Sequence, residues 1–174
     1  MTDLKKYIRD FADFPKPGIL FKDISPILRS PEAMKIVEDR FYDYYKDMEI
    51  DLIGGAESRG LIFACALARR LNKGLIMVRK RGKLPGPTNS IAYDIEYGSA
   101  VMEIQEDAVL PGQNVLLIDD LLATGGTATA AERLVEAAGG NVVGHGFVVE
   151  LTFLQGRKVL EGNDILTLVR YDNE

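Results

Sequence analysis

The fold is decided by one stretch of the sequence, Val115-Leu116-Leu117-Ile118-Asp119-Asp120-Leu121-Leu122-Ala123-Thr124-Gly125-Gly126-Thr127. Four apolar residues lead directly into two adjacent aspartates, and a loop rich in threonine and glycine follows. The apolar run predicts a strand buried on both faces, which is the usual state in a parallel sheet. Such a strand delivers the residues after it to the carboxyl edge of the sheet, where ligands of open α/β folds bind.

The residues after this strand have the chemistry to hold a sugar phosphate. The carboxylates of Asp119 and Asp120 can accept hydrogen bonds from sugar hydroxyls, each worth about 1.5–3 kcal/mol. Gly125 and Gly126 allow backbone N–H groups to close around a phosphate, and the neighbouring threonines add hydroxyl donors. No lysine follows the glycines, so this is not a Walker loop of a nucleoside triphosphate hydrolase. The alternative is that paired acids at a strand end only begin a turn or cap a helix.

Composition and length set the broad class. The 174 residues predict one domain, and a hydrophobic fraction of 47% with 27% charged residues is typical of a globular protein. No apolar run approaches the roughly 18 residues that a membrane helix needs, and the first six residues do not resemble a signal peptide. The single cysteine, Cys65, excludes a disulfide framework, and we expect it to be buried in a helix. We therefore expect a cytoplasmic protein without a membrane partner.

The charge distribution indicates an anionic small-molecule ligand. The net charge of −5 argues against a nucleic-acid partner. The basic residues nevertheless gather in Arg79-Lys80-Arg81-Gly82-Lys83, and Leu84-Pro85-Gly86-Pro87-Thr88 follows with the composition of a flexible loop. A solvated loop is one interpretation. Next to a phosphate site, a flexible lid that closes over an anion is the better one.

The apolar periodicity predicts alternating strands and helices. Strands are expected at 19–24, 51–55, 75–78, 115–118, 142–151 and 165–169, helices at 1–13, 31–48, 58–71, 127–138 and 156–160, and a hairpin at 92–104 that turns at Gly98-Ser99. This alternation predicts an α/β fold with a mainly parallel, Rossmann-like central sheet flanked by helices. Residues 1–30 and 80–105 do not fit the alternation. We expect them to form a small hood over the carboxyl edge of a single domain, 1–174.

The stretch 115–127 resembles the phosphoribosyl-pyrophosphate motif of type I phosphoribosyltransferases. The resemblance continues in Phe14-Pro15-Lys16-Pro17-Gly18-Ile19-Leu20-Phe21-Lys22-Asp23-Ile24-Ser25-Pro26, Glu57-Ser58-Arg59-Gly60, residues 79–88, Glu96-Tyr97-Gly98 and Val149-Glu150-Leu151-Thr152. The combination covers nearly the whole chain and is similar to the adenine phosphoribosyltransferase family. The resemblance implies a purine-salvage enzyme that converts adenine and phosphoribosyl pyrophosphate to AMP and pyrophosphate, with Mg²⁺ as cofactor.

The resemblance also implies roles for the residues around the opening stretch. Asp119 and Asp120 would hold the ribose hydroxyls, directly or through a Mg²⁺-bound water, and would stabilise positive charge at C1′ as pyrophosphate leaves. No protein ligand is assigned to Mg²⁺ directly, because this ion keeps most of its waters and takes oxygens from the substrate. The 5-phosphate would bind the loop that comprises Ala123, Thr124, Gly125, Gly126 and Thr127.

The pyrophosphate would bind a second loop, in which Ser58 and Arg59 supply donors beside a helix N-terminus. The family often has a cis peptide in this loop, which would fall at Glu57–Ser58. Arg79 and Lys83 of the lid are expected to contact the anion, one of them across the interface of a homodimer.

Base specificity is expected to depend on Ala123 and Glu96. In 6-oxopurine relatives an aspartate at the position of Ala123 interacts with purine N7. This chain has alanine there, so the assistance at N7 must come from another residue. Glu96, followed by Tyr97, matches the acid of adenine-specific members, and in its protonated form it could donate to N7 and favour attack by N9. Without the resemblance, Glu96 would be read as a surface residue of a hairpin. Adenine is expected to stack on Phe21, with Leu20 and Lys22 contacting its edge through backbone groups.

Other interpretations stay open at this point. An orotate or xanthine transferase on the same scaffold is disfavoured by Glu96-Tyr97 and by residues 14–26. A non-catalytic regulator that senses phosphoribosyl pyrophosphate or a nucleotide would usually carry an added DNA-binding domain, for which 174 residues leave little room. A phosphoribosyl pyrophosphate synthetase needs a longer chain. The only histidine, His145, is expected to be a structural residue with satisfied hydrogen bonds in a buried strand.

Overall fold

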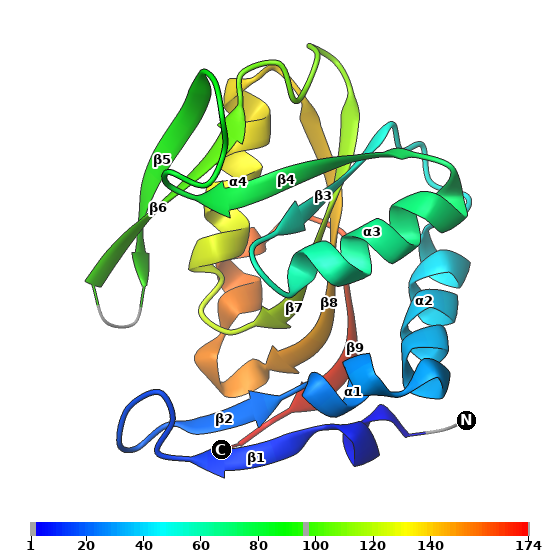
Figure 1. The fold of residues 1–174 in the computed structure, drawn as a ribbon, viewed down its shortest axis with the longest axis vertical. Coiled ribbons are helices and arrows are strands. Elements are labelled where there is room, and N and C mark those ends of the chain that lie inside the picture. The colour runs from blue at the N-terminus through cyan, green and yellow to red at the C-terminus, as the bar shows by residue number, and fades with distance from the viewer. Residues whose placement is uncertain (1–2, 96–97, 174) are drawn as a thin grey trace.

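The computed structural model describes residues 3–95 and 98–173 (Figure 1). Its elements are η1 (Leu4–Tyr7), β1 (Arg9–Ala12), β2 (Leu20–Asp23), α1 (Ser25–Arg29), α2 (Pro31–Tyr45), β3 (Leu52–Ala56), α3 (Gly60–Leu71), β4 (Gly74–Lys80), β5 (Thr88–Ile95), β6 (Gly98–Gln105), β7 (Asn114–Leu122), α4 (Gly126–Ala137), β8 (Asn141–Leu151), η2 (Thr152–Leu154), η3 (Gly156–Leu160) and β9 (Ile165–Tyr171).

In the described residues, seven strands form the central sheet in the order β5-β6-β4-β3-β7-β8-β9. The neighbouring strands β4, β3, β7, β8 and β9 pair in parallel. Strand β6 is antiparallel to both of its neighbours, β5 and β4. Helices α2 and α3 cover one face of the sheet and α4 covers the other (Figure 1). The predicted α/β class with a mainly parallel, helix-flanked sheet is confirmed.

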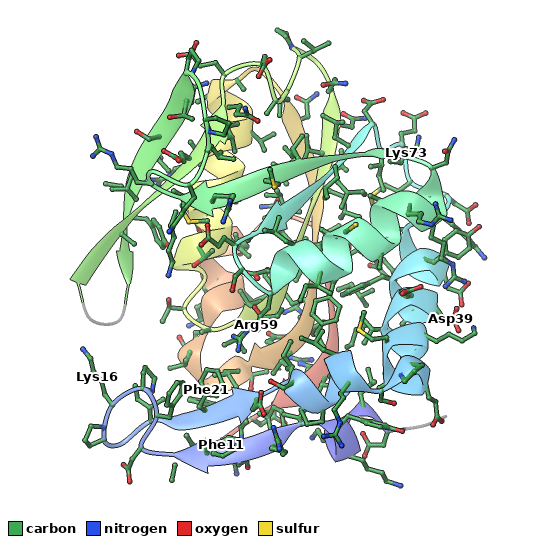
Figure 2. The ribbon with its side chains drawn as sticks, viewed as in Figure 1. Phe11, Lys16, Phe21, Asp39, Arg59 and Lys73 are labelled. Carbon is green, nitrogen blue, oxygen red and sulfur yellow. The ribbon has the colours of Figure 1, made fainter. Side chains whose placement is uncertain are left out.

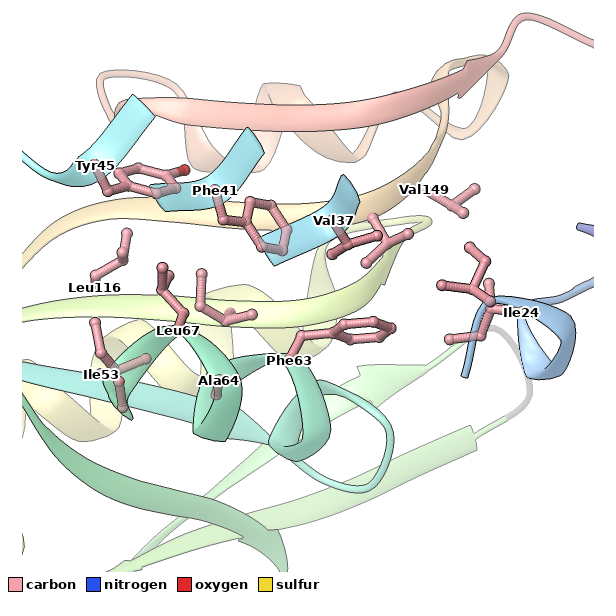
Figure 3. Close-up of a cluster of buried hydrophobic side chains, with 14 of the residues drawn as sticks. Ile24, Val37, Phe41, Tyr45, Ile53, Phe63, Ala64, Leu67, Leu116 and Val149 are labelled. Atoms are coloured by element: carbon pink, nitrogen blue, oxygen red, sulfur yellow. The ribbon is translucent and has the colours of Figure 1, made fainter. Parts of the chain in front are cut away.

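Strand β7 is buried on both faces, as its apolar run predicted. Leu116 and Ile118 belong to the core cluster between the sheet and α2 and α3, whereas Val115 and Leu117 pack against α4. Figure 3 shows the first cluster, in which Leu116 lies among residues of α2 and α3. The strand is longer than predicted: Asp119 pairs with Phe147 of β8, and pairing continues to Leu122. Both aspartates are therefore held within the sheet and do not lie in the loop after it.

Local sequence accounts for α2 and for its packed face. Ser30 accepts a hydrogen bond from the N–H of Ala33, and Pro31 begins the helix, which are both favourable at a helix N-terminus. Val37, Phe41 and Tyr45 follow one another at intervals of four residues and are fully buried. These side chains fill the layer between α2 and the sheet that Figure 3 shows.

The expected helix at 1–13 is wrong. Of the described residues 3–13, only the short turn η1 is helical, and β1 pairs antiparallel with β2 so that Phe11 lies opposite Phe21. The apolar spacing is misleading because Phe11 is 48% exposed rather than packed on a helix face. Strand β2 provides the backbone partners, and the guanidinium of Arg9 binds the carboxylate of Asp23. A partner distant in sequence therefore overrides the local pattern.

Two smaller expectations are also wrong. Gly98 and Ser99 do not form the hairpin turn, because both lie in β6, paired with Ile95 and Asp94. Cys65 is exposed and not buried. Helix α3 presents Phe63, Ala64, Leu67 and Ala68 to the core, which directs the neighbouring Cys65 to the opposite side.

The two segments that did not fit the alternation lie in different places. Residues 9–29 contain β1, β2 and α1, and the β1–β2 hairpin lies beyond the arrowheads of β7 and β8 (Figure 1). The β5–β6 hairpin extends the central sheet past β4 and contacts α4. Their role as a hood over one domain stays a prediction. Within the described residues, the helices are too short or too polar to span a bilayer.

Candidate active site

The ends of β3 and β7 meet at one cavity of about 450 Å³. Gly55 of β3 pairs with Ile118 of β7, so the residues that follow both strands emerge at the same edge of the sheet. The cavity is lined by Glu57, Ser58, Arg59, Lys80, Tyr93, Ala100, Asp119, Asp120, Leu121, Ala123 and Thr127. The structure thus brings together six residues that the sequence analysis assigned to a site: Ser58, Arg59, Asp119, Asp120, Ala123 and Thr127.

Asp119 and Asp120 have different surroundings although they are neighbours. Asp120 is 7% exposed, and its Oδ2 atom lies 2.7 Å from Nη2 of Arg59. Oδ1 of Asp119 accepts the N–H of Asp120 at 2.8 Å. Burial and the adjacent Asp120 carboxylate raise the pKa of Asp119 well above its ordinary value. Helix α3 approaches this group closely, because a Cβ on Gly60 would lie 2.6 Å from Oδ1 of Asp119.

Arg59 also contacts the aromatic residue predicted to carry the base. Its guanidinium carbon lies 5.2 Å from the ring centroid of Phe21, a cation–π geometry, and Figure 2 shows the two side chains between the start of α3 and β2. The ring of Phe14 meets Phe21 edge-on at 5.0 Å. Arg59 therefore connects Asp120 at the end of β7 with an aromatic shelf formed by the N-terminal hairpin.

The loop between β3 and α3 is tied to the start of the basic run. The Glu57–Ser58 peptide is cis, as expected from the resemblance, and Phe14–Pro15 is cis as well. Oε2 of Glu57 accepts hydrogen bonds from Nε of Arg79 at 3.1 Å and from the N–H of Lys80 at 3.0 Å. The sequence analysis chose Arg79 and Lys83 and missed Lys80, the residue of the basic run 79–83 that lines the cavity.

Glu103 anchors the first part of the lid, and sequence reasoning missed it too. Its Oε1 atom accepts the N–H groups of Gly82, Lys83 and Leu84 at 3.0, 3.1 and 3.2 Å. The side chain is 4% exposed. The available signal was an isolated acid within the predicted strand that follows the basic run. That the lid moves on ligand binding stays a prediction.

The loop before α4, residues 123–127, is called the phosphate loop below. Gly125 has a φ of +86° and directly precedes α4, and within the described residues no side chain caps the N-terminus of this helix. The N–H groups of its first turn are therefore available to an anion. Ala123 and Thr127 line the site cavity, whereas Thr124 and Gly126 line an adjoining cavity of about 510 Å³. The loop thus lies between the two spaces.

The remaining predicted residues lie in the N-terminal hairpin or beyond the described residues. Leu20, Phe21 and Lys22 lie in β2. The Nζ atom of Lys22 is 2.9 Å from Oδ1 of Asp10 and 4.3 Å from the ring centroid of Tyr171, so its side chain is already engaged. Glu96 and Tyr97 lie outside the described residues.

His145 is buried in β8, but the expectation of satisfied hydrogen bonds is wrong. Within the described residues neither ring nitrogen has a hydrogen-bond partner. The Oε2 atom of Glu132 lies 3.6 Å from Nε2. Burial lowers the pKa of His145 to about 4. The neutral ring stacks parallel to Phe147 and lies beside a small space that Asp119 also lines.

Comparison with known proteins assigns the family. A family model for a phosphoribosyl transferase domain matches residues 23–162. The adenine phosphoribosyltransferase of Solibacter usitatus is 53% identical over 172 residues, which cover 99% of each chain. That of Nitrosopumilus maritimus is 52% identical over 169 residues, 97% of this chain and 99% of the relative.

Solved structures agree with this assignment. The crystal structure of the adenine phosphoribosyltransferase of Thermoanaerobacter pseudethanolicus superposes with a TM-score of 0.94 at 48% identity, over 97% of this chain and 98% of that one. The enzyme of Saccharomyces cerevisiae, solved with adenine and an imino-altritol bisphosphate, has a TM-score of 0.89 at 43% identity, over 95% of this chain and 96% of that one. The chain belongs to the adenine phosphoribosyltransferase family.

Proposed function

We propose that the protein transfers the 5-phosphoribosyl group of phosphoribosyl pyrophosphate to N9 of adenine, giving AMP and pyrophosphate. The observation that carries this proposal is the contact of Arg59 with both Phe21 and Asp120. It connects a surface on which a purine can stack with carboxylates that suit a ribose, beside an uncapped helix N-terminus that suits a phosphate. The Trypanosoma brucei relative, 30% identical, was solved with AMP, pyrophosphate and ribose-5-phosphate, which supports the same ligands here.

The residues suggest a division of roles. The phosphate loop holds the 5-phosphate, and the Ser58–Arg59 loop with Arg79, Lys80 and Lys83 attracts the diphosphate. When the C1′–O bond breaks, its electrons leave with pyrophosphate, N9 donates a lone pair to C1′, and the proton of the adenine imidazole ring is released to solvent. The carboxylates of Asp119 and Asp120 stabilise the positive charge that develops on the ribose ring. Because burial and Asp120 raise the pKa of Asp119, its ionised form would be favoured by a cation bound nearby, a charge that Mg²⁺ would supply.

Mg²⁺ is the proposed cofactor, and it would neutralise charge on the diphosphate. Within residues 3–95 and 98–173 there is no group of three or more His, Cys, Asp or Glu side chains that could hold a metal ion. Substrate oxygens and water would therefore supply most of the ligands, which suits the reluctance of Mg²⁺ to lose water. Asp119 and Asp120 would hold the ion through bound water.

A homodimer is the proposed assembly. Ile62 of α3 and Leu75 and Met77 of β4 are 44%, 39% and 41% exposed, large values for apolar side chains. Residues 75, 77 and 79 alternate along one face of β4, so this apolar row ends at Arg79. A second copy covering the row would come close to the site at Arg79. Met77→Glu should convert a dimer to monomers in sedimentation equilibrium, whereas Leu110→Glu, at another exposed apolar residue, should leave the dimer intact.

One assay tests the activity. The purified protein is given phosphoribosyl pyrophosphate, Mg²⁺ and one base at a time, namely adenine, hypoxanthine, xanthine or orotate, and pyrophosphate release is measured. We expect release with adenine. Turnover with another base but none with adenine would overturn the base assignment. Binding of phosphoribosyl pyrophosphate without turnover of any base would favour the regulator. A cytoplasmic location stays a prediction, which cell fractionation can check.

A further inference from the structure

The short helix η3 packs directly on the phosphate loop. A Cβ on Gly156 would come closer than 3.0 Å to the carbonyl oxygen of Ala123 and to the N atom of Gly125. A Cβ on Gly125 would likewise clash with Val159 and with the carbonyl oxygen of Gly156. The two backbones therefore touch with no side chain between them. Any shift of η3 must pass directly to the loop.

A single arginine provides the strongest polar attachment of η3 to the sheet. Arg157 donates from Nε and Nη2 to the two carboxylate oxygens of Glu150, both at 3.0 Å. Nη1 donates to the carbonyl oxygen of Ile165 at 3.2 Å, and Nη2 also reaches Oγ1 of Thr167 at 3.3 Å. Glu150 is 3% exposed, so this bidentate pair is partly shielded from water. Charge-assisted pairs of this geometry fix orientation as well as position.

The far end of the segment is attached separately. Leu160 is buried beside Leu122 and Ala128, which lie on either side of the phosphate loop. Asn163 donates to Glu132 of α4 at 3.0 Å. These contacts would keep the segment folded if the arginine were lost, and they would leave Gly156, next to Arg157, as the part that is free to shift.

We propose that Arg157 is a positioning residue for the 5-phosphate: through Glu150 it holds Gly156–Leu160 against the phosphate loop and so sets the direction of the loop's N–H groups. Among the described residues that line the two cavities at the loop, Val159 comes from η3 and Arg157 is not included. Arg157 therefore acts through the backbone and not on the ligand. A phosphate site depends on donors held within a fraction of an ångström, so a small displacement is enough to weaken it. The inference rests on the proposed function of the loop.

The chain offers a matched control at the same carboxylate. Nε of Arg170 lies 3.4 Å from Oε2 of Glu150, but Arg170 belongs to β9 and not to the segment that touches the loop. Arg157→Gln and Arg170→Gln each remove one positive charge beside Glu150. Only the first releases η3. Arg157→Lys keeps the charge but loses the bidentate geometry. It is the test variant if Arg157→Gln does not fold.

The experiment compares ligands that use the loop with ligands that do not. Binding of ribose 5-phosphate and of pyrophosphate is measured by calorimetry, and KM is measured for phosphoribosyl pyrophosphate and for adenine. Arg157→Gln should weaken ribose 5-phosphate roughly tenfold to a hundredfold, as loss of a supporting contact does at other sites. It should raise KM for phosphoribosyl pyrophosphate in parallel and leave pyrophosphate binding and KM for adenine within about twofold. For Arg157→Lys, ribose 5-phosphate affinity and KM for phosphoribosyl pyrophosphate should lie between the values of Arg157→Gln and of the wild type. Arg170→Gln should match the wild type.

The other outcomes decide against the proposal. A lower Tm with wild-type ribose 5-phosphate binding in Arg157→Gln, or in Arg157→Lys, would reduce Arg157 to a structural residue. Equal weakening in Arg157→Gln and Arg170→Gln would assign the effect to the charge at Glu150 rather than to the position of η3. Failure of the wild-type protein to bind ribose 5-phosphate would instead overturn the proposed function of the loop.

Discussion

Arg59 is held by two partners at once, because its Nη2 atom lies 2.7 Å from Oδ2 of Asp120 while its guanidinium carbon lies 5.2 Å from the ring centroid of Phe21. Asp120 reaches Arg59 because β7 continues past its apolar run. Phe21 reaches Arg59 because the N-terminal hairpin lies beyond the end of the sheet. One side chain therefore connects the surroundings proposed for the ribose with those proposed for the base.

Replacing this arginine should affect both halves of the substrate pair. Arg59→Lys keeps the positive charge but loses the planar group that stacks on Phe21 and reaches Asp120. We expect kcat/KM to fall about tenfold to a hundredfold, the equivalent of one charged hydrogen bond, with KM raised for both adenine and phosphoribosyl pyrophosphate. Steady-state kinetics with each substrate varied in turn measures this.

Arg70 provides the matched control on the same helix. It also pairs with an aspartate, Asp39, and its guanidinium carbon lies 4.3 Å from the ring centroid of Tyr42, but it sits at the other end of α3. Arg70→Lys should leave both KM values unchanged. Wild-type kinetics in Arg59→Lys would remove the connecting role, and equal losses in both variants would indicate a general effect on α3.

The sequence predicted those parts of the fold that depend on local patterns. The uninterrupted apolar run at 115–118 predicted a strand buried on both faces, and the helical apolar spacing over 31–48 predicted α2, because burial alone decides both. The helix predicted over residues 1–13 was wrong because β1 depends on pairing with β2, a non-local contact. Lys80 and Glu103 were missed at the site for the same reason. Their roles arise from Glu57 and from the backbone at 82–84, which only the folded chain brings near.

Neutralising the two adjacent aspartates should change stability in opposite directions. Asp119→Asn removes a carboxylate whose ionisation is opposed by burial and by Asp120, so the free energy of unfolding at neutral pH should rise by about 0.5–2 kcal/mol. Asp120→Asn leaves Arg59 without its anionic partner, so the free energy of unfolding should fall by about 1–3 kcal/mol. Both variants should lose kcat/KM. Urea denaturation and the pyrophosphate assay provide the two readouts.

The pH dependence of Asp119→Asn gives a further check on the same group. Because the folded pKa of Asp119 lies above its unfolded value, the folded wild type keeps a proton that the unfolded chain releases as pH rises. Wild-type stability therefore falls with rising pH between those two pKa values, and the advantage of Asp119→Asn should grow over that window. An advantage that is constant from pH 4 to pH 8, or an unchanged kcat/KM, would contradict the assignment.

Loss of the carboxylate at Glu103 should loosen the lid. Glu103→Gln weakens the acceptor of three backbone N–H groups, so KM for phosphoribosyl pyrophosphate should rise about threefold to tenfold. Trypsin should also cleave faster at the basic residues 79–83. Glu106→Gln, an exposed acid just beyond β6, is the control and should match the wild type in both respects. Unchanged cleavage in Glu103→Gln would mean that other contacts hold the loop.

Glu96 lies outside the described residues, so its role is tested by kinetics alone. If its protonated form donates to N7, Glu96→Gln should lower kcat by roughly 10²–10⁴. It should also remove the alkaline limb of the kcat profile, because the amide does not lose its proton. Asp94→Asn, two residues earlier in the sequence, is the control for the loss of a negative charge. Near-normal turnover in Glu96→Gln would limit this residue to binding.

His145 should destabilise the protein as the pH falls. Burial lowers its pKa to about 4, whereas the unfolded residue titrates at 6.5, so below pH 6.5 the unfolded chain binds a proton that the folded chain does not. Stability is therefore lost progressively from pH 6.5 down to about 4, by about 3 kcal/mol at the end of that window. His145→Gln, which stays neutral, should lack this part of the decline in urea denaturation.

The opposing influence on His145 is Glu132, which lies 3.6 Å away and would favour the protonated ring. We expect burial to prevail, because the ring is 0% exposed and Glu132 already accepts a hydrogen bond from Asn163. His145 is the only histidine in the sequence, so its ring protons give one resolved pair of NMR signals that can be followed with pH. A midpoint near 4 would agree with the destabilisation, and a midpoint at 6.5 or above would show that Glu132 outweighs burial.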